Sequence, residues 1–126
     1  MNIGDVVSFK KTITETDVYL FAGITADMNP LHIDREYAAK SKFARPIAHG
    51  IIGVGILSGV MARELPGGVY LSQSIKFLHP VYMGDTIKAI AQVIERDEGK
   101  NLITFRTWCE NQDGIVVMDG EAVGLI

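Results

Sequence analysis

Three polar side chains that could do chemistry lie within one short segment of the chain: the carboxylate of Asp27, the carboxamide of Asn29 and the imidazole of His32. Pro30, between them, lacks a backbone donor and moves Asn29 out of the helical region of backbone conformation. The sequence therefore predicts a turn that brings Asp27 and His32 side by side. A carboxylate and an imidazole that converge on one water molecule can perform general acid–base chemistry near neutral pH.

The same residue types also occur in turns that do no chemistry, because Asp and Asn often hydrogen-bond their own backbone beside a proline. Two further features favour a site. The polar residues end a longer string from Phe21 to His32, and the pair His49-Gly50 stands at the start of a very apolar segment. With three scattered histidines and no CxxC or HExxH pattern, we expect neither a metal nor another cofactor.

The composition is that of a single domain over residues 1–126. Hydrophobic residues make up 48% of the chain, and 12 basic against 15 acidic residues give a net charge of −3 without a basic block. We therefore expect a substantial core and no binding of nucleic acid. Cys109 is the only cysteine, so it has no disulfide partner in the chain and is expected in the core.

Neither a targeting segment nor a membrane segment is predicted. Residues 1–5 lack the basic and apolar regions of a signal peptide. The apolar run from His49 to Arg63 is too short and too rich in glycine to span a bilayer. We expect a cytoplasmic protein with no membrane partner.

The first half of the chain predicts one strand and two short helices. Residues 6–12 are rich in β-branched and aromatic side chains, as strands are. Thr14 and Asp17 have the spacing of a capping box, which predicts a helix to about Ala26. Asp34 can cap a second short helix over residues 35–39.

A long helix is predicted from Gly50 to about Leu65, ended by Pro66 and the glycines after it. Because apolar residues cover most of its circumference, we expect it to be buried on nearly all sides. Small residues at steps of three and four form one face, where a sheet, a partner helix or a ligand could approach closely: Gly55, Ser58, Gly59 and Ala62.

Four strands are predicted after this helix, over residues 69–77, 86–96, 102–110 and 115–125. In the first of them Val69, Leu71, Gln73, Ile75 and Phe77 alternate onto one side. Short turns require antiparallel neighbours. The fold class is therefore α+β, a hot-dog arrangement in which an antiparallel sheet wraps one long buried central helix. One such unit leaves a sheet edge and one side of the helix uncovered, so we expect a homodimer or higher homo-oligomer.

The string from Phe21 to His32 resembles the hydratase 2 motif of the MaoC-like (R)-specific enoyl-CoA hydratases. Three further segments match in the same order: residues 45–50, the pair Ser58-Gly59, and residues 80–85. The resemblance covers nearly the whole chain. It implies a trans-2-enoyl-CoA substrate and reversible syn addition of water across the 2,3 double bond, giving an (R)-3-hydroxyacyl-CoA.

The resemblance implies that Asp27 and His32 are catalytic, and we assign Asp27 as the main base with His32 holding the same water. Which of the two protonates the α-carbon stays open. Gly50 stands at the expected start of the long helix, where unpaired N–H groups gather. Its N–H could polarise the thioester carbonyl, or the residue could be an ordinary glycine at a helix start.

Four more residues are candidates for binding or supporting roles, each beside a structural alternative. Asn29 can orient the loop or a water, or cap the turn; His49 can support the site or cap a turn. Ser58 can touch the site or belong to the small packing face. Met61 can line an acyl pocket or fill the core. Basic residues near the motif could meet the phosphates of coenzyme A, but none is assigned.

Two other functions fit the same fold. An acyl-CoA thioesterase would use a carboxylate-activated water to attack the carbonyl carbon instead. A non-catalytic acyl-CoA-binding module would have no need of Asp27 and His32. Within the hydratase hypothesis, the acyl chain length and the choice between coenzyme A and an acyl carrier protein are left open.

Overall fold

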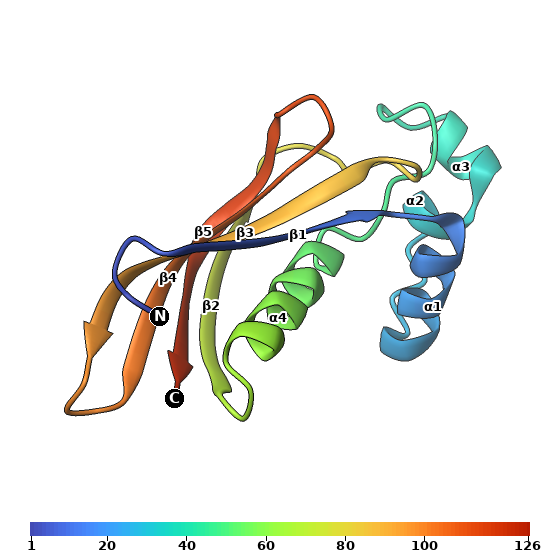
Figure 1. The fold of residues 1–126 in the computed structure, drawn as a ribbon. Helices are drawn as coiled ribbons and strands as arrows, with labels where there is room; N and C mark the ends of the chain where they lie inside the picture. Colours follow the sequence, from blue (N-terminus) through green and yellow to red (C-terminus); the bar gives the residue numbers. More distant parts are fainter.

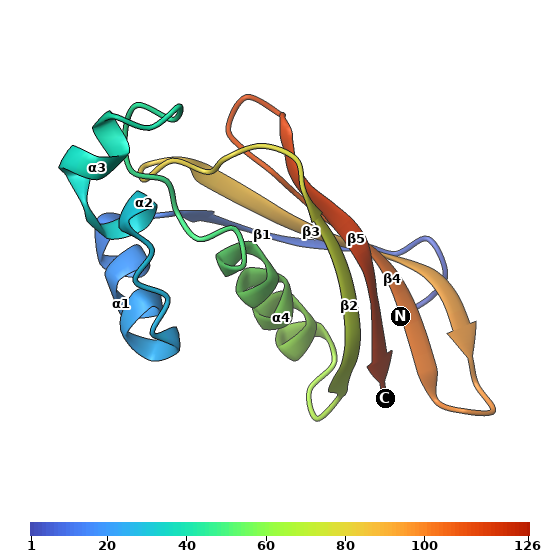
Figure 2. The same cartoon turned by 180° about the vertical axis from the view of Figure 1, so that it is seen from behind.

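The computed structural model describes all of residues 1–126. A curved sheet of five antiparallel strands, in the order β1-β3-β4-β5-β2, packs on one side against the long helix α4 (Figure 1). Three shorter helices gather beside the first turn of α4 (Figures 1 and 2). This is the predicted hot-dog arrangement. The elements run as β1 Val6–Thr12, α1 Glu15–Thr25, α2 Pro30–Ile33, α3 Arg35–Ala39, α4 Ile52–Glu64, β2 Val69–Phe77, β3 Thr86–Asp97, β4 Leu102–Glu110 and β5 Val116–Leu125.

The capping box predicted at the start of α1 is present. The Thr14 hydroxyl accepts from the N–H of Asp17 at 3.1 Å, and the Asp17 carboxylate accepts from the N–H of Thr14 at 2.9 Å. Ala26 ends α1 in the left-handed conformation, with φ 61°. Such a residue reverses the chain at a helix end, so the segment that follows turns back toward α4.

The segment after α1 is more regular than the predicted turn, because Pro30–Ile33 forms the one-turn helix α2. A proline is well suited to the first helical position, where its missing N–H would have no partner in any case. The carboxamide of Asn29 caps this turn by accepting from the N–H of Leu31 at 3.1 Å. His32 is thereby held on a short rigid element.

The four predicted strands after α4 are confirmed, and the two short turns join antiparallel neighbours β3–β4 and β4–β5. The regular alternation predicted for β2 is wrong at its start. A bulge shifts the register between Tyr70 and Ser72, so Val69 and Leu71 are about half exposed while Tyr70 is partly buried. A bulge adds one residue to a strand and re-aims the side chains that precede it.

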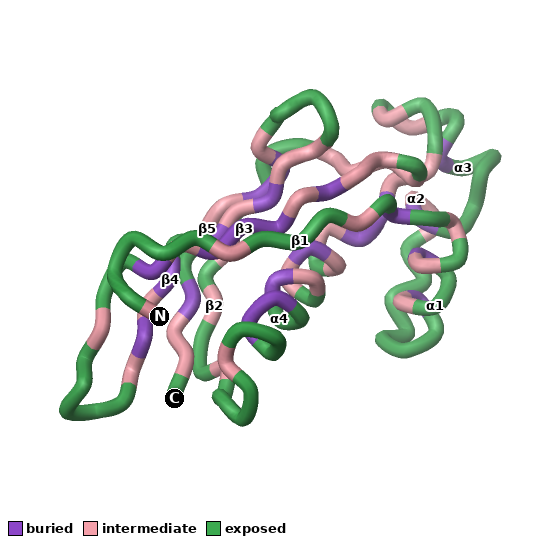
Figure 3. Tube along the Cα trace, in the orientation of Figure 1, coloured by how far each residue is buried: buried purple, intermediate pink, exposed green.

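Helix α4 is buried on one face only, and the predicted burial on nearly all sides is wrong for the isolated chain (Figure 3). Its buried residues are Gly53, Leu57, Val60 and Met61. The face formed by Gly55, Ser58, Gly59 and Ala62 is exposed. The glycine that permits close packing on the sheet is instead Gly53, where a Cβ atom would collide with the side chain of Met118.

The core lies between α4 and the sheet. One cluster of buried side chains includes Leu57 and Val60 together with Ile87, and a second joins Met61 to Phe105. Cys109 is fully buried in the first cluster, as predicted, and burial raises the pKa of its thiol to about 12. No helix in the structure has the length and apolar character needed to cross a membrane.

Candidate active site

Asp27 and His32 come together at the first turn of α4, and His49 joins them. One polar atom from each of the three side chains, a carboxylate oxygen of Asp27 and a ring nitrogen of each histidine, lies within 4.8 Å of the other two. Asp27 stands in the loop between α1 and α2 and is exposed, whereas His32 and His49 are buried. One carboxylate oxygen of Asp27 accepts from the N–H of Asn29 at 3.3 Å, which fixes the loop and leaves the other oxygen without a partner in the chain.

The hydrogen bond of His32 determines its tautomer. Its Nδ1 lies 2.6 Å from the carbonyl oxygen of Ile47, and since a carbonyl only accepts, Nδ1 must carry the hydrogen. The Nε2 of a neutral His32 is then an acceptor. Burial lowers the pKa of His32, and the nearby His49 lowers it further, against the opposing effects of the Ile47 carbonyl and Asp27. At neutral pH the ring therefore offers a lone pair to a water.

His49 touches both residues of the pair. Its Nε2 donates to the main-chain carbonyl of Asp27 at 2.9 Å. Its ring lies against the ring of His32, with centroids 3.9 Å apart, and against Phe21 of α1 at 4.8 Å. Of the two roles considered from the sequence, a turn cap does not describe these contacts, because each of them reaches another element.

Gly50 and Ile51 lead into α4, whose start has no side-chain cap. The chain contains no hydrogen-bond partner for the N–H of Gly50. The positive end of the helix dipole lies at this end of α4. A Cβ atom on Gly50 would lie 2.7 Å from the ring of Phe77, so only glycine fits beside that ring as it stands.

A cavity of about 590 Å³ opens onto these groups. Asp27, His32, His49 and Gly50 all line it. Part of the remaining wall comes from the two matched segments, residues 45–50 and 80–85, and the remainder comes from positions 42, 43, 51 and 77–79, which the sequence did not assign to the site. These lining residues are Lys42, Phe43, Ile47, Ala48, Ile51, Phe77, Leu78, His79, Pro80 and Val81. Phe77 and Leu78 are 54% and 52% exposed, and large exposed apolar side chains at a cavity mouth are the signal that only the structure reveals.

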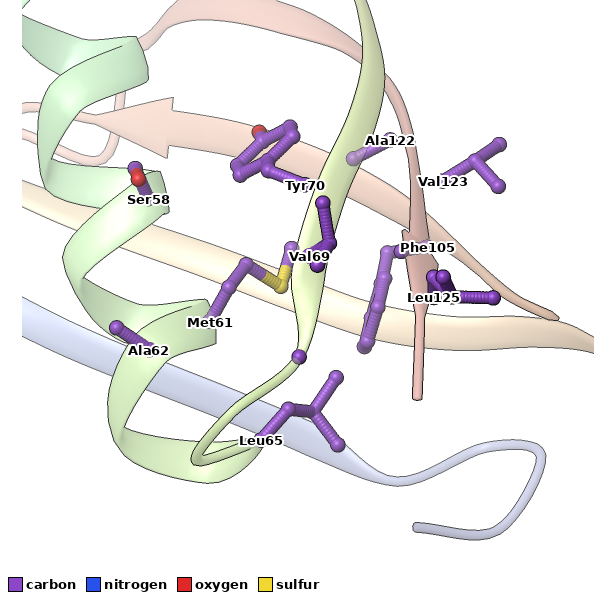
Figure 4. Close-up of a pocket in the computed structure, with 12 residues that line it drawn as sticks. Ser58, Met61, Ala62, Leu65, Val69, Tyr70, Phe105, Ala122, Val123 and Leu125 are labelled. Carbon is purple, nitrogen blue, oxygen red and sulfur yellow. The ribbon is translucent and has the colours of Figure 1, made fainter. Parts of the chain in front are cut away.

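Ser58 and Met61 lie about two and three helical turns beyond Gly50, at a second and smaller cavity of about 90 Å³ (Figure 4). Met61 extends from the helix toward the strands that carry Tyr70 and Phe105 (Figure 4). A groove between α1, α4 and β2 has both Ile51 and Ser58 in its wall. Ile51 also lines the site cavity. The site cavity, this groove and the small cavity therefore follow one another along one face of α4.

Asn29 does not line any of these three hollows. Its side chain caps α2, which is the structural alternative considered for it. The carboxylate of Asp27 with the two imidazoles is a donor set that could also bind a transition-metal ion. Acid–base chemistry on a water needs only the carboxylate and one imidazole.

Known proteins resemble this chain over nearly its full length. The family model described as "MaoC like domain" matches residues 2–113. An (R)-specific enoyl-CoA hydratase of Rhodospirillum rubrum is 42% identical over 125 residues, covering 98% of this chain and 86% of that protein. A mitochondrial 3-hydroxyacyl-[acyl-carrier-protein] dehydratase of Arabidopsis thaliana is 36% identical over 129 residues, covering 100% and 78%.

A solved structure agrees with the fold in detail. The (R)-hydratase from A. caviae involved in PHA biosynthesis superposes with a TM-score of 0.96 at 35% identity, covering 100% of this chain and 97% of that one. The family match spans most of the chain, and the two protein relatives exceed one third identity over nearly all of it. The chain belongs to the MaoC-like domain family.

Proposed function

We propose that this protein is an (R)-specific enoyl-CoA hydratase, which adds water reversibly to a trans-2-enoyl-CoA to give an (R)-3-hydroxyacyl-CoA. The observation that carries the proposal is the convergence of the Asp27 carboxylate and the His32 imidazole in one cavity beside the free N–H of Gly50. The related hydratases support the same reaction. Residues 1–126 act as one domain in this proposal.

The two side chains act together on one water. Ionised Asp27 accepts one hydrogen of the water and Nε2 of neutral His32 accepts the other, so the oxygen lone pair is directed at the substrate. The oxygen then bonds to the β-carbon as one water proton passes to the acid–base pair. The electrons of the double bond move toward the thioester oxygen, and the pair returns a proton to the α-carbon, which restores its starting state.

The thioester oxygen gathers negative charge during this step, and Gly50 is placed to stabilise it. Its N–H lacks a partner in the chain and lies at the positive end of α4. One preorganised donor of this kind contributes on the order of 3 kcal/mol to transition-state stability. The absence of a Cβ leaves room for the thioester beside Phe77.

The acyl tail follows the exposed face of α4 in this proposal. It passes Ile51 and Ser58 in the groove and ends in the small cavity that Met61 lines. The wall of that cavity is largely apolar, which suits a hydrocarbon tail. Ser58 therefore has a lining role, and Met61 sets the depth.

We further propose that the active protein is a homodimer or larger homo-oligomer in the cytoplasm. Strand β2 is a sheet edge, and the small-residue face of α4 is exposed in the single chain. Unpaired edges and exposed apolar faces are commonly covered by a second copy. Light scattering during size-exclusion chromatography tests this, and a monomer at all assay concentrations contradicts it.

The reaction itself is tested by incubating the protein with crotonyl-CoA. A hydratase removes the conjugated enoyl absorbance without releasing thiol, and chiral analysis gives the (R)-3-hydroxy product. A thioesterase releases free thiol instead, and a binding module does neither. Either of those two results, with folded protein, rejects the proposed function.

A further inference from the structure

His49 is more deeply buried than either member of the acid–base pair, with 2% of its surface exposed. Its Nδ1 has no hydrogen-bond partner in the chain. An unpaired buried acceptor costs about 1–3 kcal/mol, so an apolar ring of similar shape would serve stability better. The presence of an imidazole here points to a task other than packing.

The contacts of His49 reach each catalytic element by a different route. Its Nε2–H holds the main chain of Asp27 at 2.9 Å, and its ring supports the ring of His32 at 3.9 Å. Its own carbonyl accepts from the N–H of Ile52 at 3.0 Å, at the start of α4, and Gly50 is its neighbour in the chain. The base and its partner thus contact the His49 side chain, and the proposed oxyanion donor is joined to its main chain.

The loop that carries Asp27 has little else to fix it there. Residues 23–29 are exposed, and the hydrogen bonds of Asp27 itself are local ones, to Thr25 and Asn29. The bond from His49 is the one that ties this loop to the segment that carries Gly50 and leads into α4. A shift of about 1 Å in a catalytic group can cost 100-fold in rate, so losing this bond should affect catalysis more than folding.

We propose that His49 is a positioning residue that sets the Asp27 carboxylate and the His32 ring against the N–H of Gly50, chiefly through the hydrogen bond from its Nε2 to the Asp27 carbonyl. This inference rests on the proposed hydratase function. His49 then serves activity, and the fold retains it at some cost in stability, as is common at functional sites.

Two substitutions separate the hydrogen bond from the ring. His49→Phe keeps an aromatic ring against Phe21 and His32 but removes the donor and the unpaired acceptor. His49→Gln removes the ring but keeps an N–H at the position of Nε2. As a control for loss of stability alone, Ile103→Val removes one buried methylene at the other end of the sheet.

With crotonyl-CoA we expect kcat of His49→Phe to fall by about 100-fold, with KM little changed and Tm equal to or above wild type. His49→Gln should recover most of that kcat, even if its Tm is lower. Ile103→Val should lower Tm and leave kcat unchanged.

Wild-type kcat in His49→Phe overturns the proposal. So does an equal loss of kcat in both His49 variants, or a loss that follows Tm across all variants including the control. If His49→Phe does not fold, the residue is structural and the proposal also fails. Failure of the hydratase assignment is a separate result, because it appears as an inactive wild-type protein in the same assay.

Discussion

The rings of His32 and His49 lie 3.9 Å apart between centroids, and each ring gives one N–H to a main-chain carbonyl, that of Ile47 and that of Asp27. Two imidazoles so close cannot both be charged without strong repulsion. The arrangement therefore favours the neutral ring of His32, whose Nε2 lone pair the proposed reaction uses.

The pH dependence of activity follows from this arrangement. His32 must be neutral, and its pKa is lowered from the ordinary value of 6.5, chiefly by burial. We expect the midpoint of the decline in kcat/KM for hydration at low pH to lie below 6.5, as His32 gains its proton. A pH profile of kcat/KM checks this, and a midpoint above 6.5 contradicts it.

Stability should show the same sign of pH dependence. The unfolded chain binds the proton of His32 near pH 6.5, whereas the folded protein binds it only at lower pH. The unfolded state therefore holds more protons in that window, and the free energy of unfolding should decrease as the pH falls through it. Denaturant titrations of the wild type and of His32→Asn at several pH values measure the contribution of His32 to the free energy of unfolding. Equal pH slopes in the two proteins contradict the prediction.

Asp27→Asn should separate binding from catalysis. The amide has nearly the shape of the carboxylate but cannot take a proton, so turnover of crotonyl-CoA should fall at least ~100-fold while the substrate still binds. His32→Ala should lose a similar amount, and Ser58→Ala much less. Steady-state kinetics with calorimetric binding measure both quantities. Near-native turnover in Asp27→Asn rules out this base.

Gly50→Ala should lower kcat and raise KM together. The added Cβ would lie 2.7 Å from the ring of Phe77 and would occupy the side of the cavity where the thioester is proposed to bind. The double variant Gly50→Ala/Phe77→Ala removes the Phe77 ring but keeps the added Cβ at position 50. We expect it to stay impaired, and full recovery would mean that Gly50 matters only for its fit against Phe77.

Met61→Ala should change substrate preference more than rate. Met61 lines the small cavity at the far end of the proposed acyl path (Figure 4). Its truncation deepens that cavity, so the ratio of kcat/KM for longer against shorter enoyl-CoA chains should rise. A panel of chain lengths measures this ratio. An unchanged ratio at retained activity would place the tail elsewhere.

The sequence was sufficient to predict most of the fold, because its strands, caps and turns are local signals. The capping box of Thr14 and Asp17 and the short turn before Leu102 are examples, and both are present. It also pointed to the hot-dog arrangement, because one apolar helix among antiparallel strands leaves few other packings.

What the sequence missed depends on contacts between distant segments. The alternation of β2 breaks at a bulge beside Leu71, in the pairing with β5. The hydrogen bond from His49 to the Asp27 carbonyl joins residues 22 positions apart. The sequence made His49 a candidate for a supporting role, but its partner could not be predicted, because no local pattern predicts a contact between two distant segments.

The exposed side of α4 shows the same limit. Apolar periodicity predicts which residues prefer burial, but it does not say what covers them, and Gly55 and Gly59 have open space beside them in the single chain. Close packing on the sheet occurs instead at Gly53, against Met118. A helical glycine packed against the sheet and one with open space beside it are therefore predicted to respond to substitution in opposite ways.

Gly53→Ala should destabilise the protein. Replacing a helical glycine by alanine gains up to about 1 kcal/mol of helix propensity, but the added Cβ would collide with the buried side chain of Met118. Overpacking of this kind costs about 1–3 kcal/mol, so the net change should be a loss of up to about 2 kcal/mol.

The matched variant is Gly23→Ala in α1, where nothing lies within 4 Å of the added atom. This variant should gain up to about 1 kcal/mol of stability from helix propensity, without the collision. Chemical denaturation of both variants gives the two changes. A gain at Gly53 equal to the gain at Gly23 would show that Met118 yields without cost, and that α4 is not pressed against the sheet at this point.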